Sequence, residues 1–271
     1  MKPVQLLGVL NVTPDSFSDG GCYLQPTLAR ARARELWEQG ADWVDVGAES
    51  TRPGAPAVSE QEELRRLREV FTELQAAKRP WSIDTQKPAV MSAAIAAGAS
   101  MVNDVNALQA PGALEACAGA PVAVVLMHRQ GDAATMQQSP HYADVVSEVL
   151  DFLRERKEAC LRVGIPESQI ICDPGIGFGK TLQHNLQLLR ATARLRAELA
   201  APLLIGVSRK SMFRDLLGLD STDARILPSV QTAVWAANQG AEYLRVHDVL
   251  QTRQGLKLWQ ALNAPDPTAW E

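Results

Sequence analysis

Polar side chains recur directly after short apolar runs along the 271-residue chain, where they could bind a small molecule. Asn11 ends the first of these runs, Asp84 the third, Asn103 the fourth and Asp173 the sixth. In parallel α/β folds the carboxyl ends of the strands meet at one pole, and ligands bind there. A single strand-end Asp or Asn is often only a helix cap or a turn former. Because nearly every run ends in such a group, we favour a binding site.

Two of these side chains are carboxylates that should face the interior of the fold. Asp84 and Asp173 each end an apolar run. A carboxylate there suits paired hydrogen bonds to a heterocycle that carries a ring N–H beside an amino group. Asn103 could add a donor and Lys210 a cation. Together these residues predict a heterocycle pocket deep in the fold.

Basic residues at the same pole predict an anion. Arg52, Lys210 and Arg245 lie beside predicted helix N-termini. Capping does not explain them, because a helix N-terminus prefers anionic neighbours. Cations in that position instead favour a bound phosphate or pyrophosphate. The expected site therefore has a heterocycle pocket and an anion site at its rim.

A repeated unit of an apolar run, a turn and an amphipathic stretch must position these residues. The runs are continuous, as in parallel strands that are covered on both faces. We expect strands at 5–10, 43–47, 81–84, 101–104, 122–127, 170–173, 203–207 and 243–246. We expect helices at 26–39, 60–78, 88–97, 112–118, 142–163, 182–199, 222–239 and 250–262.

These units predict an α/β fold, a closed (β/α)8 TIM barrel forming a single domain over residues 1–271. An open doubly wound sheet is the alternative. The barrel is favoured because the units fill the chain and leave no linker between them.

Composition argues against several classes of protein. With 27 basic and 31 acidic residues, the formal net charge of −4 gives no reason to expect nucleic-acid or membrane binding. No apolar run approaches the roughly 20 residues of a membrane span, and none resembles a signal peptide. The four cysteines form no C-x-x-C pair, so we expect reduced thiols in a cytoplasmic protein.

Several familiar motifs fail on inspection. Gly179-Lys180-Thr181 looks like the end of a P-loop, but Pro174 stands where the first glycine is required. The glycines nearby lack the spacing of a dinucleotide fingerprint, and the chain has neither a zincin histidine pair nor a G-x-S-x-G elbow. We expect His141 and His184 to be solvated residues at helix starts.

Longer motifs carry a resemblance to a known family. The segment 8–21 reads GVLNVTPDSFSDGG and the segment 49–54 reads ESTRPG. Further matches are Asp84-Thr85 with Lys87-Pro88, Asn103-Asp104, Leu126-Met127-His128, Asp173-Pro174-Gly175 with Gly177-Phe178-Gly179-Lys180, Ser208-Arg209-Lys210-Ser211, and Arg245-Val246-His247-Asp248. From the first strand to the last, the chain resembles the dihydropteroate synthases.

The resemblance implies a TIM barrel enzyme. Such a transferase condenses 6-hydroxymethyl-7,8-dihydropterin diphosphate with 4-aminobenzoate, giving 7,8-dihydropteroate and pyrophosphate in folate biosynthesis. It also implies a magnesium ion, a homodimer through the helices that flank the last two strands, and inhibition by sulfonamides that compete with 4-aminobenzoate.

The resemblance also implies roles for individual residues. The pterin would be held by Asp84, Asn103, Asp173 and Lys210, with Met127 lining its pocket. The diphosphate would be held by Asn11, Arg245 and His247, with Asn11 reaching magnesium. The aminobenzoate pocket would comprise Phe17, Thr51, Arg52, Pro53, Phe178 and Ser211. The catalytic residues among these would be Asp173, Lys210, Arg245 and His247.

Two alternatives share the pterin-binding barrel. One is a paralogue that binds pterin without catalysis, and the other is a methyltetrahydrofolate-dependent methyltransferase domain. The first has no use for residues that serve only catalysis and aminobenzoate binding. The second has no use for Ser50-Thr51-Arg52-Pro53, so the synthase is favoured. The chain departs from the usual family pattern at Gln86, at Arg129 and over 225–229.

Overall fold

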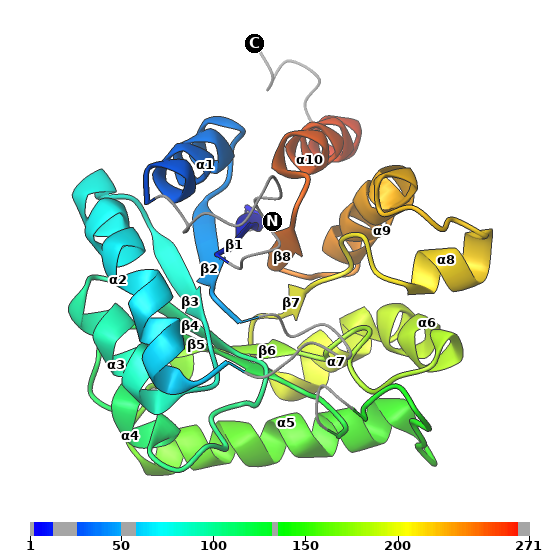
Figure 1. Cartoon of the computed structure of the whole chain (residues 1–271). Coiled ribbons are helices and arrows are strands. Elements are labelled where there is room, and N and C mark those ends of the chain that lie inside the picture. Colours follow the sequence, from blue (N-terminus) through cyan, green and yellow to red (C-terminus); the bar gives the residue numbers. More distant parts are fainter. Residues whose placement is uncertain (1–2, 13–25, 50–57, 132–134, 265–271) are drawn as a thin grey trace.

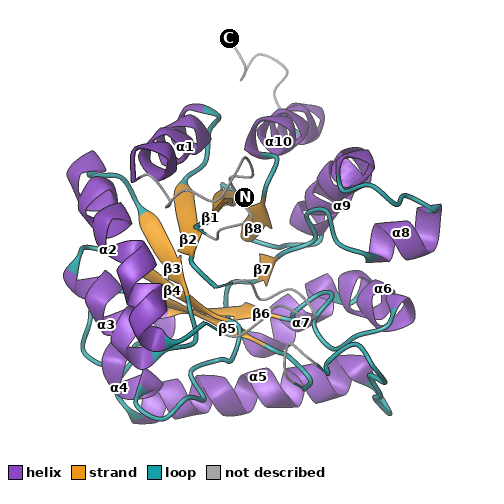
Figure 2. Ribbon diagram, viewed as in Figure 1, coloured by secondary structure: helices purple, strands orange, loops and turns teal. Residues whose placement is uncertain are grey.

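Eight parallel strands form the wall of a barrel in a computed structural model of the chain (Figures 1 and 2). The structure describes residues 3–12, 26–49, 58–131 and 135–264. The strands are β1 (Gln5–Asn11), β2 (Trp43–Gly47), β3 (Trp81–Asp84), β4 (Met101–Asp104), β5 (Ala123–Met127), β6 (Ile170–Asp173), β7 (Leu204–Ile205) and β8 (Tyr243–Val246). The predicted strands are confirmed, although β7 is shorter than expected.

The sheet is closed, as the barrel prediction requires. Its strand order is β6-β5-β4-β3-β2-β1-β8-β7, so neighbours in the chain are neighbours in the wall. A parallel bridge between Cys172 and Leu203 joins β6 to the start of β7. An open doubly wound sheet would reverse its strand order at a switch point, and this sheet does not.

Helices surround the barrel wall (Figure 2). They are α1 (Pro26–Glu38), α2 (Glu60–Ala77), α3 (Pro88–Ala96), α4 (Ala113–Cys117), α5 (Val145–Arg162), α6 (Leu182–Arg190), α7 (Thr192–Leu199), α8 (Met212–Leu217), α9 (Ile226–Asn238) and α10 (Val249–Asn263). The helix predicted over 182–199 is divided at Ala191, and α8 was not predicted at all. The helix predicted to start at 222 begins with a 3₁₀ turn, Asp223–Arg225. Asp144 caps α5, so that helix starts later than expected.

Alternate side chains along each strand point into the barrel, and their chemistry changes along its axis. Toward the amino ends of the strands lies an apolar inner cluster, which consists of Leu7, Met101, Val125, Ile171 and Leu204. Two residues further along their strands stand polar groups: Asp45 after Trp43, Asn103 after Met101, Asp173 after Ile171 and Arg245 after Tyr243. The apolar cluster therefore forms a floor beneath a polar chamber at the carboxyl pole.

The other face of each strand packs against the helices. Leu6, Leu10, Val44, Val46 and Ile83 belong to the large outer core that also contains buried residues of the helices. Burial on both faces explains why the strands read as continuous apolar runs. No helix in the described ranges is both long and apolar enough to cross a membrane.

Candidate active site

A buried ion-pair network crosses the barrel from β8 to β2 and β3. Arg245 Nε donates to Asp45 Oδ2 at 2.6 Å, and Arg245 Nη2 donates to Asp84 Oδ2 at 2.6 Å. Asp45 is fully buried and also accepts from Ser82 Oγ at 2.5 Å and from Asn103 Nδ2 at 3.1 Å. One guanidinium thus joins carboxylates whose positions in the sequence lie 200 and 161 residues away.

The second oxygen of Asp84 is the unusual atom in this network. Asp84 Oδ1 is buried and has no hydrogen-bond partner among the described residues. Burial raises the pKa of Asp84 to about 7, although the Arg245 guanidinium opposes the shift and Asp45 adds to it. A buried acceptor without a partner is costly, and a ring N–H or amino group of a ligand would satisfy it.

Asp173 ends β6, which lies three strands along the wall from β3. Met127 and Asp173 are register partners across β5 and β6, just as Asp84 and Asn103 are across β3 and β4. Asp173 Oδ1 accepts from the backbone N–H of Gly175 at 2.7 Å. Burial raises the pKa of Asp173 to about 6, against the effects of the Gly175 hydrogen bond and the nearby lysines. Of the residues predicted to hold the pterin, Asp84, Asn103, Met127 and Asp173 thus all lie within the last two residues of their strands.

Lys210 and Phe178 form the wall beside this chamber. The Lys210 ammonium lies over the Phe178 ring, 3.9 Å from its centroid. This is a cation–π contact, which also holds a charged group close to Asp173. The structure therefore brings together one residue predicted for the pterin and one predicted for the aminobenzoate pocket.

The β8 end carries the residues predicted for the diphosphate. Ser208 Oγ accepts from the backbone N–H of His247 at 3.1 Å and lies 3.0 Å from His247 Nδ1, which fixes the imidazole. Arg245, predicted for the same group, donates through Nε and Nη2 to the carboxylate network. Asn11 ends β1 opposite Gly47 of β2. Ser211 lies exposed at the start of α8.

Four predicted site residues cannot be placed. Phe17, Thr51, Arg52 and Pro53 lie outside the described residues. The structure also shows what two other polar residues of the quoted motifs and helix starts do. Asp104 accepts from the backbone N–H groups of Asn106 and Leu108, both at 2.7 Å, so it caps a turn. His184 is not simply solvated, because its Nδ1 accepts from the Thr181 N–H at 3.3 Å and its ring meets Tyr142 edge-on.

Sequence reasoning missed Asp45, although a signal was present. Asp45 is the only charged residue within β2, in the middle of an apolar run. Only the register reveals that it faces inward and pairs across the barrel. Sequence reasoning also missed an ion-pair cluster beside the site, in which Lys87 Nζ contacts Glu49 at 2.9 Å and Glu63 at 2.5 Å.

Two of the three departures from the family pattern, at Gln86 and over 225–229, make local contacts. Gln86 Nε2 donates to Glu49 at 3.4 Å, at the edge of the Lys87 cluster. The Arg225 guanidinium donates to the carbonyls of Leu219 and Asp220. Ser229 Oγ accepts from the Arg209 N–H at 2.8 Å, which ties the start of α9 to the turn that carries Lys210.

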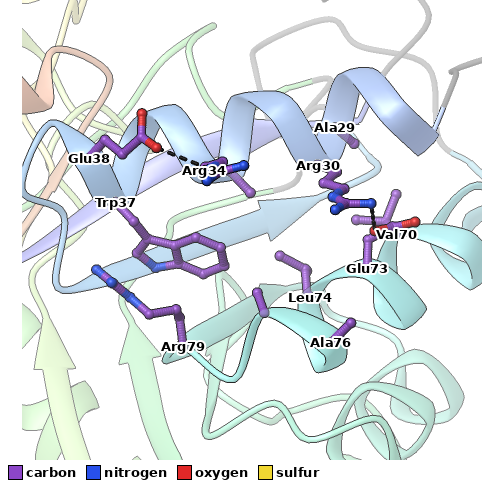
Figure 3. A pocket seen from close by; sticks show the side chains of 12 residues that line it. Ala29, Arg30, Arg34, Trp37, Glu38, Val70, Glu73, Leu74, Ala76 and Arg79 are labelled. Carbon is purple, nitrogen blue, oxygen red and sulfur yellow. Dashed lines mark hydrogen bonds and ion pairs between the residues drawn. The ribbon is translucent and has the colours of Figure 1, made fainter.

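A groove between α1 and α2 lies outside this site (Figure 3). Trp37, Ala77 and Arg79, which line it, lie at the carboxyl ends of these helices, the pole opposite the chamber. Its charges are largely matched, since Arg30 pairs with Glu73 and Arg34 with Glu38. We therefore place the functional site in the barrel chamber and not in this groove.

Comparison with known proteins identifies the family. The family model for pterin binding enzymes matches residues 7–247. A dihydropteroate synthase of Neisseria meningitidis serogroup C is 47% identical over 264 residues, covering 96% of this chain and 93% of the relative. The Escherichia coli K12 dihydropteroate synthase is 43% identical over 268 residues, covering 98% and 94%.

The chain belongs to the dihydropteroate synthase family.

Solved structures of this family agree with the fold. The Xanthomonas albilineans dihydropteroate synthase with 4-aminobenzoic acid has a TM-score of 0.92 and 48% identity, covering 98% of this chain and 95% of that one. The Yersinia pestis dihydropteroate synthase in a sulfonamide drug complex has a TM-score of 0.90 and 45% identity, covering 96% and 94%.

The Arg245 network yields a prediction about stability. Arg245→Ala should lower the free energy of unfolding by about 3–5 kcal/mol, because it leaves two buried carboxylates without their cation. Urea denaturation measures the change. Arg214→Ala is the control, since its ion pair with Asp215 is exposed and should contribute at most about 1 kcal/mol. Equal unfolding midpoints for Arg245→Ala and the unchanged protein would contradict the network's role.

Proposed function

We propose that this protein is a dihydropteroate synthase: it condenses 6-hydroxymethyl-7,8-dihydropterin diphosphate with 4-aminobenzoate to give 7,8-dihydropteroate and pyrophosphate. The observation that carries the proposal is the chamber itself. Two buried carboxylates with raised pKa values end β3 and β6: Asp84 lies beside Asn103, and Asp173 lies near Lys210. Relatives of matching length bind the substrate and product of this reaction, 4-aminobenzoate and 7,8-dihydropteroate.

The chamber suits a pterin because its polar atoms match the edge of that ring. The ring carries N–H and amino donors, and Asp84 Oδ1 is a buried acceptor that lacks a partner among the described residues. Asn103 is held by Asp45, and Asp45 is held by Arg245. We infer that Arg245 acts on the pterin side by aligning these groups, in addition to its expected contact with the diphosphate.

The proposed chemistry is a substitution at the pterin methylene carbon. The C–O bond to the diphosphate breaks, its electron pair leaves with pyrophosphate, and the methylene becomes cationic and conjugated with the pterin ring. The ionised carboxylate of Asp173 stabilises that charge. The neutral amine of 4-aminobenzoate then forms the new C–N bond and releases one proton. No side-chain nucleophile is required.

We infer that a magnesium ion accompanies the diphosphate. Within the described ranges, no group of three His, Cys, Asp or Glu residues could hold a metal alone. Magnesium is commonly held by one or two protein oxygens together with substrate phosphates, so the amide oxygen of Asn11 at the end of β1 fits this need. When bound, the ion supplies positive charge beside the leaving pyrophosphate.

The aminobenzoate pocket completes the proposal. We infer that Phe178 and Ser211 line it together with Phe17, Thr51, Arg52 and Pro53. We further infer that sulfonamides compete for it, because they present a similar aniline ring. The sulfonamide drug complex of the Yersinia pestis relative supports this inference.

We also propose a homodimer through α9 and α10. These helices pack against each other, since a Cβ on Gly255 would lie 3.0 Å from Val234 Cγ2. Each also exposes large apolar side chains: Leu227 and Trp235 on α9, and Leu258 and Leu262 on α10. Large apolar surfaces on adjacent helices are typical of an interface.

Turnover tests the proposed function. The purified protein, supplied with magnesium and both substrates, should release pyrophosphate in step with dihydropteroate. Asp173→Asn should keep the fold but lose on the order of 100-fold or more in kcat, because the cation loses a buried charge partner. The absence of product with the unchanged protein would refute the proposed function, and an Asp173→Asn variant with unchanged kinetics would refute the role of Asp173.

The raised carboxyl pKa values predict the pH dependence of the reaction. Asp173 must be ionised to act, and its pKa is raised to about 6. The value of kcat/KM should therefore fall as the pH drops through about 6, well above the range of an ordinary carboxyl group near 4. A stopped assay from pH 5 to 8.5 measures this limb. A value that stays level down to pH 5 would contradict the assignment.

Light scattering at micromolar concentration tests the dimer. The unchanged protein should have twice the mass of its 29.4 kDa chain. Leu258→Glu should shift it to a monomer, because a buried interface does not tolerate an unpaired charge. Leu28→Glu on α1 is the matched control, since Leu28 is also exposed but lies on a different helix. A monomeric unchanged protein would refute the dimer.

A further inference from the structure

The segment after β5 and the segment after β6 lie in direct backbone contact at the carboxyl pole of the barrel. A Cβ on Gly175 would lie 1.9 Å from the carbonyl oxygen of His128, and a Cβ on Gly179 would lie 2.3 Å from that of Gln130. Both glycines have positive φ, 69° and 62°. No other residue type could occupy these positions without moving the backbone. The two segments are therefore built to approach each other closely.

Lys180 is buried at the junction of these segments. Its side chain is 3% exposed. Its Nζ lies 2.9 Å from His128 Nδ1, and it donates to the carbonyl oxygens of His128 at 3.3 Å and of Phe178 at 3.0 Å. An ammonium has three N–H donors and here meets three acceptors. One side chain thus ties the segment after β5 to the segment after β6.

The charges around Lys180 agree with this geometry. Burial lowers the pKa of His128 to about 3, and the Lys180 charge contributes, so the imidazole is neutral and can accept. Burial also lowers the pKa of Lys180 to about 7, but the nearby Asp173 carboxylate opposes the shift. An ammonium with three acceptors and a carboxylate nearby has the surroundings that a buried cation requires.

The bond to Phe178 connects Lys180 to the site. The carbonyl that Lys180 holds belongs to the residue whose ring lies over the Lys210 ammonium at 3.9 Å. Tyr142 Oη supports the same turn by donating to the Gly179 carbonyl at 2.8 Å. The position of the Phe178 ring therefore depends on Lys180, a residue that is not among the predicted substrate contacts.

We propose that Lys180 is a positioning residue for the second substrate: it fixes Phe178 by joining the segments after β5 and β6. The proposal rests on the proposed function for its kinetic readout. Lys180 itself contacts neither substrate. Its loss should therefore weaken use of 4-aminobenzoate far more than use of the pterin diphosphate.

Lys180→Met tests this, because methionine fills a similar space without donors or charge. Steady-state kinetics should show the KM for 4-aminobenzoate raised on the order of tenfold, with the KM for the pterin diphosphate within about twofold. Lys157→Met is the matched control. Lys157 Nζ also donates to a backbone carbonyl, that of Leu199, and pairs with Glu167, but Lys157 belongs to α5, on the outside of the barrel.

A double-mutant cycle with Phe178→Ala separates positioning from a general loss of stability. If Lys180 acts through Phe178, the double variant should raise the KM for 4-aminobenzoate no more than Phe178→Ala alone. If the two substitutions raise the KM for 4-aminobenzoate independently, so that their factors multiply in the double variant, the proposal is overturned. An equal change in both KM values, or no change in either, would also overturn it. If Lys180→Met does not fold, Lys180→Gln, which keeps one shorter donor, takes its place in the cycle.

Hydrogen exchange gives a readout that does not need activity. In Lys180→Met, amide exchange should quicken in residues 128–130 and 174–181 and stay unchanged in α2 and α10. Unchanged protection of both segments would overturn the proposal even if the enzyme were inactive. If the unchanged protein has no synthase activity but the variant shows this exchange pattern, the proposed function fails while the structural role of Lys180 stands.

Discussion

The chamber depends on one constraint: several carboxylates are buried at one end of a barrel and each needs a positive partner. Arg245 is the positive partner of Asp45 and Asp84, to which it donates two hydrogen bonds of 2.6 Å. Lys180 and Lys210 are the positive groups near Asp173. Removing one partner of a buried ion pair costs far more free energy than replacing the whole pair with apolar side chains. The cations thus keep acceptors available where a polar heterocycle can use them.

The barrel supplies the geometry that this electrostatic arrangement requires. The apolar floor around Leu7 and Met101 fills the amino end of the interior, so the polar side chains occupy only the carboxyl end. Register places Asp84 beside Asn103 and Met127 beside Asp173. Outside the wall, the segments after β5 and β6 are drawn together by Gly175, Gly179 and Lys180. The strands thus position the residues proposed to bind the pterin, and the segments that follow them position those proposed to bind the second substrate.

Much of this architecture could be predicted from the sequence because it depends on local patterns. Continuous apolar runs located the strands, and the residues that end them gave Asp84, Asn103 and Asp173. The break between α6 and α7 at Ala191 could not be predicted, since neither glycine nor proline marks it. The long predicted helix therefore divides where the sequence carries no residue typical of a helix end.

The residues that were missed are those whose role depends on contacts across the barrel. Asp45 lies inside an apolar strand, and its partner Arg245 is 200 residues away in the sequence. Lys180 was considered only as part of a failed P-loop motif and of a family motif, because its sequence neighbours do not reveal that it is buried against His128. Long-range pairs of buried charges leave little local signal, so a fold is needed to find them.

Calorimetry of pterin binding tests the central claim most directly. If ionised carboxylates recognise the ring and their pKa values are raised, binding must expel the protons that they hold. Titration of 6-hydroxymethylpterin in two buffers of different ionisation enthalpy should show proton release near pH 6 and almost none at pH 8. Asp173→Asn should release fewer protons near pH 6 than the unchanged protein. Binding without proton release at either pH would contradict the account.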